Sequence, residues 1–144
     1  MAQSERDWDA SRAVVSLLRA DSKAAQALER ALGQAGLSLP QFNVLMVLAS
    51  SPEARTPVFE LNAQLVSTPP NTSWLSDRMQ ERGLVKKSRS PDDGRVVILE
   101  LTEKGWGALG KAAPLVFEAE RSLLNGFSRT DLRTLGELLT RFLA

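Results

Sequence analysis

Only one stretch of this chain is patterned as a β-hairpin, and the rest is patterned as helix. Residues 96–101 are rich in β-branched and large apolar side chains, which favours an extended strand. A cluster of turn-forming residues at 90–94 precedes this strand, and residues 84–89 form a weaker strand candidate before the turn. The sequence therefore predicts a mainly α fold with a small β-hairpin as its only β structure.

Start and stop signals divide the remainder into six helices with apolar positions three or four residues apart. The clearest signal is the capping box of Ser38 and Gln41, which opens the second helix. Thr56 and Pro57 are typical of a helix cap and first helical residue, and Pro114 should kink the fifth helix. The six helices are predicted over residues 5–32, 38–50, 56–67, 68–83, 102–126 and 128–144.

The order of these elements predicts a winged helix-turn-helix. Two short helices separated by few residues form a helix-turn-helix candidate, and the hairpin that follows forms the wing. The terminal helices lie outside this unit, and a long amphipathic end helix needs a second body to cover its apolar stripe. We therefore expect an N-terminal dimerisation helix (1–36), a winged domain (37–101) and C-terminal dimerisation helices (102–144).

The chain contains no cysteine and no histidine. It therefore lacks a thiolate nucleophile, an imidazole base and the side chains of an ordinary zinc site. No spacing of the other polar residues indicates a catalytic constellation, so we expect no enzyme activity, no cofactor and no metal. No apolar run approaches the roughly 18–20 residues of a bilayer span, and the polar N-terminus is unlike a signal peptide. These features predict a cytoplasmic protein without membrane contact.

Basic residues gather between the fourth helix and the hairpin. Residues 77–95 carry six basic and four acidic side chains, whereas the whole chain has a net charge of only +1. A protein of near-zero net charge can bind nucleic acid when its basic residues share one surface. The same charges would also suit a solvated face with ion pairs four residues apart, so charge alone leaves both interpretations open.

The fourth helix sharpens the nucleic-acid hypothesis. If Leu75 and Met79 point inward, a polar face remains, and the first turn is short in bulk and rich in hydrogen-bonding groups. Such side chains can contact base edges or phosphates in the major groove, although ordinary N-capping also explains part of the pattern. The candidate residues are Thr68, Pro70, Asn71, Thr72, Ser73, Trp74 and Arg78.

The predicted wing supplies a second basic element. Arg95 should project from the hairpin tip, where Asp93 can pair with it and Gly94 permits a turn with positive φ. An Arg on a thin protrusion suits a narrow minor groove, while the alternative is an unremarkable β-turn with a surface ion pair. Lys87 and Arg89 on the preceding strand complete this candidate set.

Three segments carry a family resemblance. They are residues 37–45 (LSLPQFNVL), residues 77–85 (DRMQERGLV), and Asp93-Gly94-Arg95 followed by LTEKG at 101–105. Together with the helix order they make the chain resemble the MarR family of bacterial regulators. The bulky Trp74 and the stiff Pro69-Pro70 pair depart from that pattern. Trp74 could pack on a thymine methyl or the DNA backbone, or could be half buried.

The resemblance implies a homodimer that binds a pseudo-palindromic double-stranded DNA operator. It implies that the fourth helix enters the major groove and that Arg95, braced by Asp93, reaches the minor groove. It also implies a repressor released by a small aromatic or phenolic ligand, held between the dimerisation helices and the winged domain. The alternative is a winged-helix module for protein–protein contact, with Trp74 as its anchor.

A ligand pocket is the least defined part of the sequence. Aromatic and sulfur-containing side chains could line it, with a basic side chain as partner for an anion. The simpler alternative is that the apolar members belong to the core or to a dimer interface. The candidates are Trp8, Arg12, Phe42, Met46 and Trp106.

Overall fold

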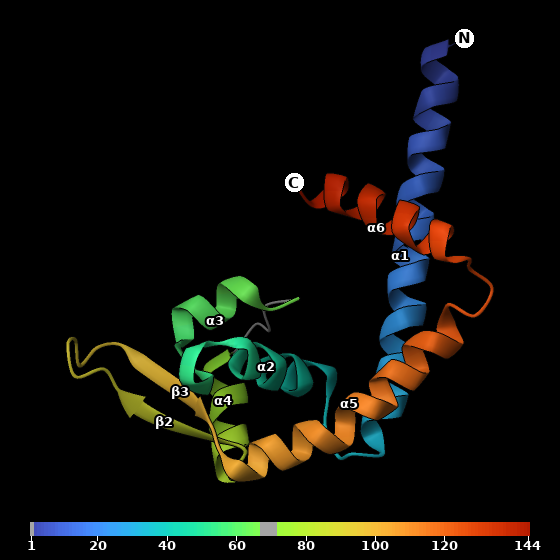
Figure 1. Cartoon of the computed structure of the whole chain (residues 1–144). Helices are drawn as coiled ribbons and strands as arrows, with labels where there is room; N and C mark the ends of the chain where they lie inside the picture. Colours follow the sequence, from blue (N-terminus) through green and yellow to red (C-terminus); the bar gives the residue numbers. More distant parts are fainter. Residues whose placement is uncertain (1, 67–71) are drawn as a thin grey trace.

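A computed structural model describes residues 2–66 and 72–144, with side chains described from residue 4 onward. Figure 1 shows a winged domain and a set of long terminal helices joined at the base of α5. The elements are α1 (Ala2–Gly33), α2 (Leu39–Ser50), the 3₁₀ turn η1 (Pro52–Ala54), β1 (Arg55–Pro57), α3 (Val58–Gln64), α4 (Thr72–Glu81), β2 (Val85–Arg89), β3 (Val97–Leu101), α5 (Glu103–Leu123) and α6 (Arg129–Leu143). The mainly helical fold with a small wing is confirmed.

The hydrophobic core is centred on the winged domain, and Leu32 of α1 and Leu109, Ala112 and Val116 of α5 complete it. The helix α2 lies at its centre and packs against α3, the sheet and the start of α5. Each large side chain removed from water here contributes roughly 1.5–3 kcal/mol. The largest fully buried side chains are Leu32, Val44, Leu45, Leu48, Leu61, Met79, Leu84, Val85 and Leu99.

Side chains cap three of the helices, and the predicted capping box of Ser38 and Gln41 is confirmed. The Ser38 hydroxyl oxygen accepts a hydrogen bond from the Gln41 backbone N–H at 3.3 Å, and the Gln41 side-chain oxygen accepts from the Ser38 N–H at 3.1 Å. Thr102 caps α5 by accepting from the Gly105 N–H at 3.0 Å. Ser128 caps α6 with Asp131 as its capping-box partner. These caps fix where the helices begin because they satisfy N–H groups that have no partner within the helix.

The hairpin is not the only β structure, so that expectation is wrong. The short strand β1 pairs antiparallel with β3, and the sheet has the order β1-β3-β2. Thr56 and Pro57 lie in this edge strand instead of opening the helix, and α3 begins at Val58 and ends at Gln64. Proline is tolerated in an edge strand because it has no N–H to donate to the ladder. The buried Thr56 hydroxyl instead donates to the Glu60 carboxylate at 3.3 Å.

Two helix ends also differ from the expectation. The first helix is slightly longer than predicted, since α1 covers Ala2–Gly33. The helix α5 ends at Leu123, three residues before the predicted stop, and keeps Pro114 inside it. The start of the fourth helix at residues 68–71 lies outside the described residues.

A glycine lets α5 begin directly against the loop that follows α4. A Cβ on Gly105 would lie 2.2 Å from the Leu84 carbonyl oxygen and 2.7 Å from a Leu101 methyl. The Thr102 hydroxyl donates to the Gly83 carbonyl at 2.5 Å in the same region. The LTEKG segment therefore locks α5 onto the winged domain.

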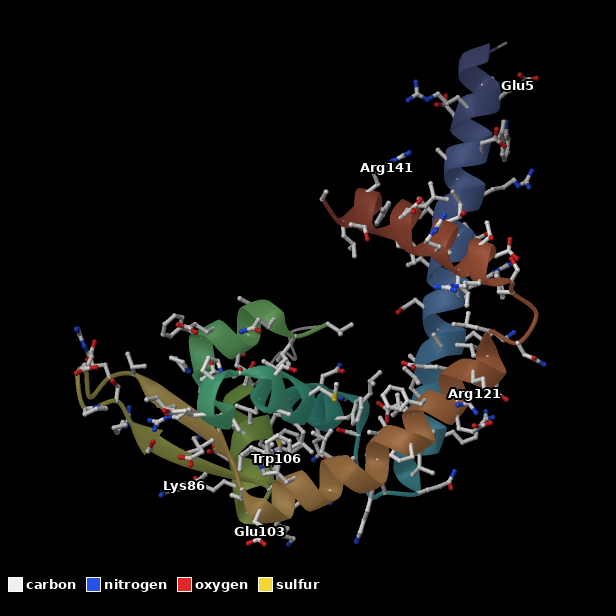
Figure 2. All side chains as sticks on the ribbon, in the orientation of Figure 1. Glu5, Lys86, Glu103, Trp106, Arg121 and Arg141 are labelled. Atoms are coloured by element: carbon white, nitrogen blue, oxygen red, sulfur yellow. The ribbon has the colours of Figure 1, made fainter. Side chains whose placement is uncertain are left out.

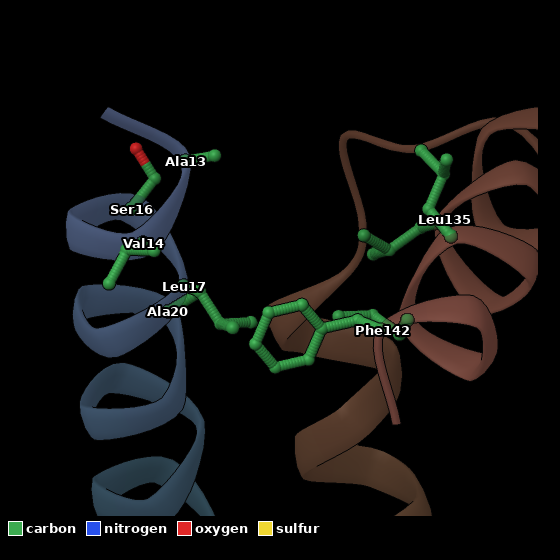
Figure 3. Close-up of a pocket in the computed structure, with 9 residues that line it drawn as sticks. Ala13, Val14, Ser16, Leu17, Ala20, Leu135 and Phe142 are labelled. Carbon is green, nitrogen blue, oxygen red and sulfur yellow. The ribbon is translucent and has the colours of Figure 1, made fainter. Parts of the chain in front are cut away.

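The terminal helices expose their apolar faces. Along its whole described length α6 buries none of its residues in one protomer. The outer half of α1 exposes Trp8, Val14, Val15 and Leu18. Figure 3 shows the cleft of about 410 Å³ between the two helices, where Leu17 of α1 faces Phe142 of α6. The cleft is almost wholly apolar in its lining residues, which is typical of a surface that another chain covers.

Candidate nucleic-acid interface

The helix α4 presents a polar and aromatic face to solvent. Leu75 and Met79 are buried, as predicted, and Ser76 is buried beside them with its hydroxyl donating to the Ser73 carbonyl at 2.9 Å. Ser73, Trp74 and Arg78 are exposed, and Thr72 is half-buried at the first helical position. The other predicted members of this face, Thr68, Pro70 and Asn71, lie outside the described residues.

Trp74 is a surface residue that supports its neighbour one turn along. Its side chain is 59% exposed, so it is not a core residue. The Arg78 guanidinium carbon lies 5.8 Å from the centre of the Trp74 ring, within the range of a cation–π contact. Arg78 also lies 3.8 Å from the Glu81 carboxylate, in an exposed ion pair. The two side chains therefore form one unit on the outer face of α4.

The wing is tied to α4 through Lys87. Its ammonium group pairs with the Asp77 carboxylate, and its backbone N–H donates to the Gln80 side-chain oxygen at 2.8 Å. These two contacts hold β2 against α4, so the relative position of helix and wing is fixed. Asp77 and Gln80 were not among the predicted site residues. Their position on α4, one turn apart and opposite a strand of basic residues, is the signal that could have indicated this link.

The wing tip holds Arg95 in one orientation. The Asp93 carboxylate accepts from the Arg95 backbone N–H at 3.0 Å and from its guanidinium Nε at 3.2 Å. These hydrogen bonds, first from the backbone and then from the side chain, lower the pKa of Asp93 below its ordinary value. The Arg95 side chain remains 91% exposed. A fixed and solvated guanidinium at the end of a hairpin is suited to a partner that carries negative charge.

Gly94 does not use its freedom to adopt positive φ, so that expectation is wrong. Among the described glycines, positive φ occurs at Gly36 and Gly83. The turn is closed instead by the Val96 N–H, which donates to the Asp93 carbonyl at 2.9 Å, and by the Ser90 N–H, which donates to the Val96 carbonyl at 2.9 Å. A five-residue connection leaves enough room for ordinary backbone angles between these two bonds.

Ser73, Lys87, Arg89 and Arg95 line two clefts between helix and wing, whereas Thr72, Trp74, Arg78 and Asp93 line neither. One cleft of about 310 Å³ is lined by Ser73 from α4 and by Lys87 and Arg95 from the wing. Phe59 of α3, which the sequence did not single out, lies in the same cleft. The other cleft, of about 280 Å³, is lined by Gln80, Lys87 and Arg89. The first turn of α4 and the wing thus share one surface.

The five candidate ligand residues do not meet within one protomer. Figure 2 shows Trp106 at the base of α5 and Glu5 near the free end of α1, and Trp8 lies within one turn of Glu5. Phe42 is buried in the core of the winged domain, whereas Met46 and Trp106 are partly exposed. The cleft between α1 and α6 contains none of the five.

The described part of the chain offers little to other kinds of site. Among residues 2–66 and 72–144, no three acidic, histidine or cysteine side chains gather in a way that could hold a metal ion. None of the described helices has both the length and the apolar character needed to cross a bilayer.

Comparison with known proteins identifies the family. The model of the MarR family matches residues 37–97. The transcriptional repressor IacR of Pseudomonas putida is 26% identical over 85% of this chain and 72% of its own length. A MarR family regulator from Streptomyces coelicolor, solved in complex with DNA, has a TM-score of 0.84 at 24% identity, over 92% of this chain and 84% of that one.

A third similar protein, BpsR of Bordetella bronchiseptica, was solved in a study of how 6-hydroxynicotinic acid regulates its DNA binding. It has a TM-score of 0.83 at 19% identity, over 92% of this chain and 99% of that one. The winged domain at residues 37–97 therefore belongs to the MarR family, and over most of its length the chain is similar to DNA-binding transcriptional regulators of that family.

Proposed function

We propose that this protein is a homodimeric repressor that binds a specific pseudo-palindromic operator in the cytoplasm. In each protomer α4 enters the major groove and the wing enters the adjacent minor groove. The single observation that carries this proposal is the shared cleft, because Ser73 of α4 and the exposed Arg95 of the wing line the same surface. Side chains of α4 then face base edges while the wing contacts the neighbouring backbone and groove.

The second copy is proposed to bind through the terminal helices. The exposed apolar faces of α1 and α6 support this, since a soluble monomer rarely exposes a large apolar patch. In this arrangement residues 1–36 and 102–144 serve dimerisation and residues 37–101 bind DNA. The two α4 helices would lie one DNA turn apart, roughly 34–36 Å, in successive major grooves on the same face of the duplex.

A small aromatic or phenolic ligand is proposed to release the repressor from its operator. The regulation of the Bordetella protein by an aromatic acid supports this class of effector. The proposed site lies between the dimerisation helices and the winged domain, with Phe42, Met46 and Trp106 on one protomer. Because Trp8 and Arg12 lie on the outer part of α1, they would reach this site from the partner subunit.

The experiment that tests DNA binding compares two arginines of different position. Arg95→Ala should weaken binding to the selected operator and reduce the slope of log affinity against log salt by about one, because one groove contact is lost. Arg121→Ala is the matched control, since Arg121 is exposed and lies on α5 far from the wing. The measurement is fluorescence anisotropy of a labelled duplex at several salt concentrations.

Equal affinities and equal salt slopes for wild type and Arg95→Ala would contradict the assignment of the wing. No salt-dependent binding to any duplex by wild type would contradict DNA binding by this surface. It would favour the alternative of a protein partner anchored on Trp74.

A further inference from the structure

The outer face of α4 carries an arginine whose position is set by an aromatic neighbour. The Arg78 guanidinium lies over the Trp74 ring at 5.8 Å, four residues along the same helix. Neither side chain is buried, so the contact does not serve the core. A free arginine loses rotamer entropy when it binds, and a ring that already holds the guanidinium reduces that loss.

The acidic neighbours of Arg78 leave its guanidinium available. Asp77 is adjacent in sequence, but its carboxylate pairs with the Lys87 ammonium group of the wing. Glu81 lies 3.8 Å from Arg78 in an exposed ion pair, which is a weak interaction in water. The stacked guanidinium can therefore exchange the Glu81 carboxylate for a base edge without leaving the Trp74 ring.

We infer that Trp74 and Arg78 read a thymine–guanine step as one unit, an inference that rests on the proposed docking of α4 in the major groove. Arg78 donates two hydrogen bonds to O6 and N7 of the guanine. The Trp74 ring, stacked on that guanidinium, lies beside the neighbouring base and packs on the C5-methyl group of thymine, which projects into the same groove. Trp74 is thus a specificity-determining residue and also positions Arg78.

The first test is selection of binding sites from a randomised duplex library by the full-length protein. Wild type should select half-sites that contain a thymine–guanine step. Arg78→Lys should lose the guanine preference by about tenfold, because an ammonium group cannot form the planar bidentate pair as well as a guanidinium. Trp74→Ala should weaken both preferences, whereas Trp74→Phe should retain much of them because it keeps an aromatic face.

The second test changes the DNA and compares wild type with the Trp74 variants. Replacing the selected thymine by deoxyuridine removes only the methyl group, and should weaken wild-type binding by about fourfold, the equivalent of one buried methyl. The same replacement should have no effect on Trp74→Ala, so the two changes should not be additive. Trp74→Phe, which keeps a ring, should still respond to loss of the methyl.

The outcomes separate this inference from the proposed function. If wild type selects no motif at all, sequence-specific binding itself is wrong. If wild type selects a motif that Trp74→Ala and Arg78→Lys select equally well, binding by α4 stands and the reading unit is overturned. A loss of affinity on Arg78→Ala that is equal for all sequences, with a smaller salt slope, would make Arg78 a phosphate contact and would also overturn it.

Discussion

The winged domain and the terminal helices use their apolar side chains in opposite ways. In the winged domain, α2 buries Phe42, Val44, Leu45 and Leu48 within one protomer. In the C-terminal region, α6 has a clear apolar stripe and buries none of it within the described chain. Figure 1 shows the same contrast in shape, since the winged domain is compact, α1 extends away from it, and α6 lies across the outer part of α1.

This difference indicates which part of the molecule is complete in one copy. The core of the winged domain is completed by Leu32 of α1 and by Leu109, Ala112 and Val116 of α5, all from the same chain, so this core does not depend on a partner. The extended helices gain most of their stability from packing, because propensity alone stabilises an isolated helix poorly. We therefore expect the DNA-binding unit to survive changes that abolish assembly, while the end helices do not survive alone.

The largest effect should come from placing charges on the apolar stripe of α6. Leu135→Asp combined with Leu138→Asp removes two leucines from each side of the proposed interface, at roughly 1.5–3 kcal/mol per leucine. The dimer dissociation constant should rise more than about a thousandfold. Sedimentation equilibrium measures this, and operator affinity should fall with it because both half-sites must be held together.

Thr140→Asp is the matched control, since Thr140 lies on the polar side of the same helix. It should leave the dimer intact. The double variant should still unfold cooperatively on heating, because the core of the winged domain is untouched. A double variant that stays dimeric at micromolar concentration would contradict the dimer proposed here.

The next largest effect should come from a substitution at the contact between α5 and the winged domain. Gly105→Ala would place a Cβ 2.2 Å from a backbone oxygen, so the start of α5 must move. Such overpacking costs about 1–3 kcal/mol, and the whole domain should unfold at lower denaturant concentration. The control is Gly107→Ala in the same helix, where a Cβ meets nothing within 4 Å and alanine should stabilise by up to about 1 kcal/mol.

An unchanged midpoint for Gly105→Ala, together with an unchanged slope, would mean that α5 is not locked onto the winged domain. In that case the winged domain would not be complete in one protomer in the way that the comparison with the terminal helices requires. If both glycine variants lower the free energy of unfolding, a difference in helix propensity does not explain how positions 105 and 107 differ.

Local signals in the sequence predicted much of the fold but not its long-range pairing. The capping boxes at Ser38 and Ser128 were predictable because their partners lie three residues away. The strand β1 was missed because three residues carry too little pattern, and its pairing with β3 depends on a contact more than forty residues along the chain. Thr56 and Pro57 match the local signature of a helix start, and the tertiary pairing with β3 overrides it.

The candidate site shows the same limit. Asp93 and Arg95 are two residues apart, so their hydrogen bonds could be anticipated from the turn. The pairing of Lys87 with Asp77 joins a strand to a helix, and no local pattern predicts the register between the two elements. The candidate ligand residues were grouped by chemistry alone, and a protomer spreads them from the free end of α1 to the base of α5.

The smallest expected effect concerns pH and separates the two capping boxes. The box of α2 uses the neutral Gln41, whereas that of α6 uses Asp131, whose pKa is lowered by hydrogen bonds from the Ser128 side chain and backbone. Because the folded-state pKa is lowered, this contribution is fully present above the unfolded-state value of about 4 and is lost as pH falls through the folded value. Acid should therefore weaken α6, and with it the dimer, more than it weakens α2.

Asp131→Gln gives the capping box of α6 a neutral partner like the one in the capping box of α2. Sedimentation and helical circular dichroism between pH 6 and pH 3, taken as the difference between wild type and this variant, isolate the effect from other carboxylates. Asp93 also has a lowered pKa, but it holds a loop and adds no helical signal. Identical acid profiles for the two proteins would show that the cap of α6 does not limit the stability of the extended helices.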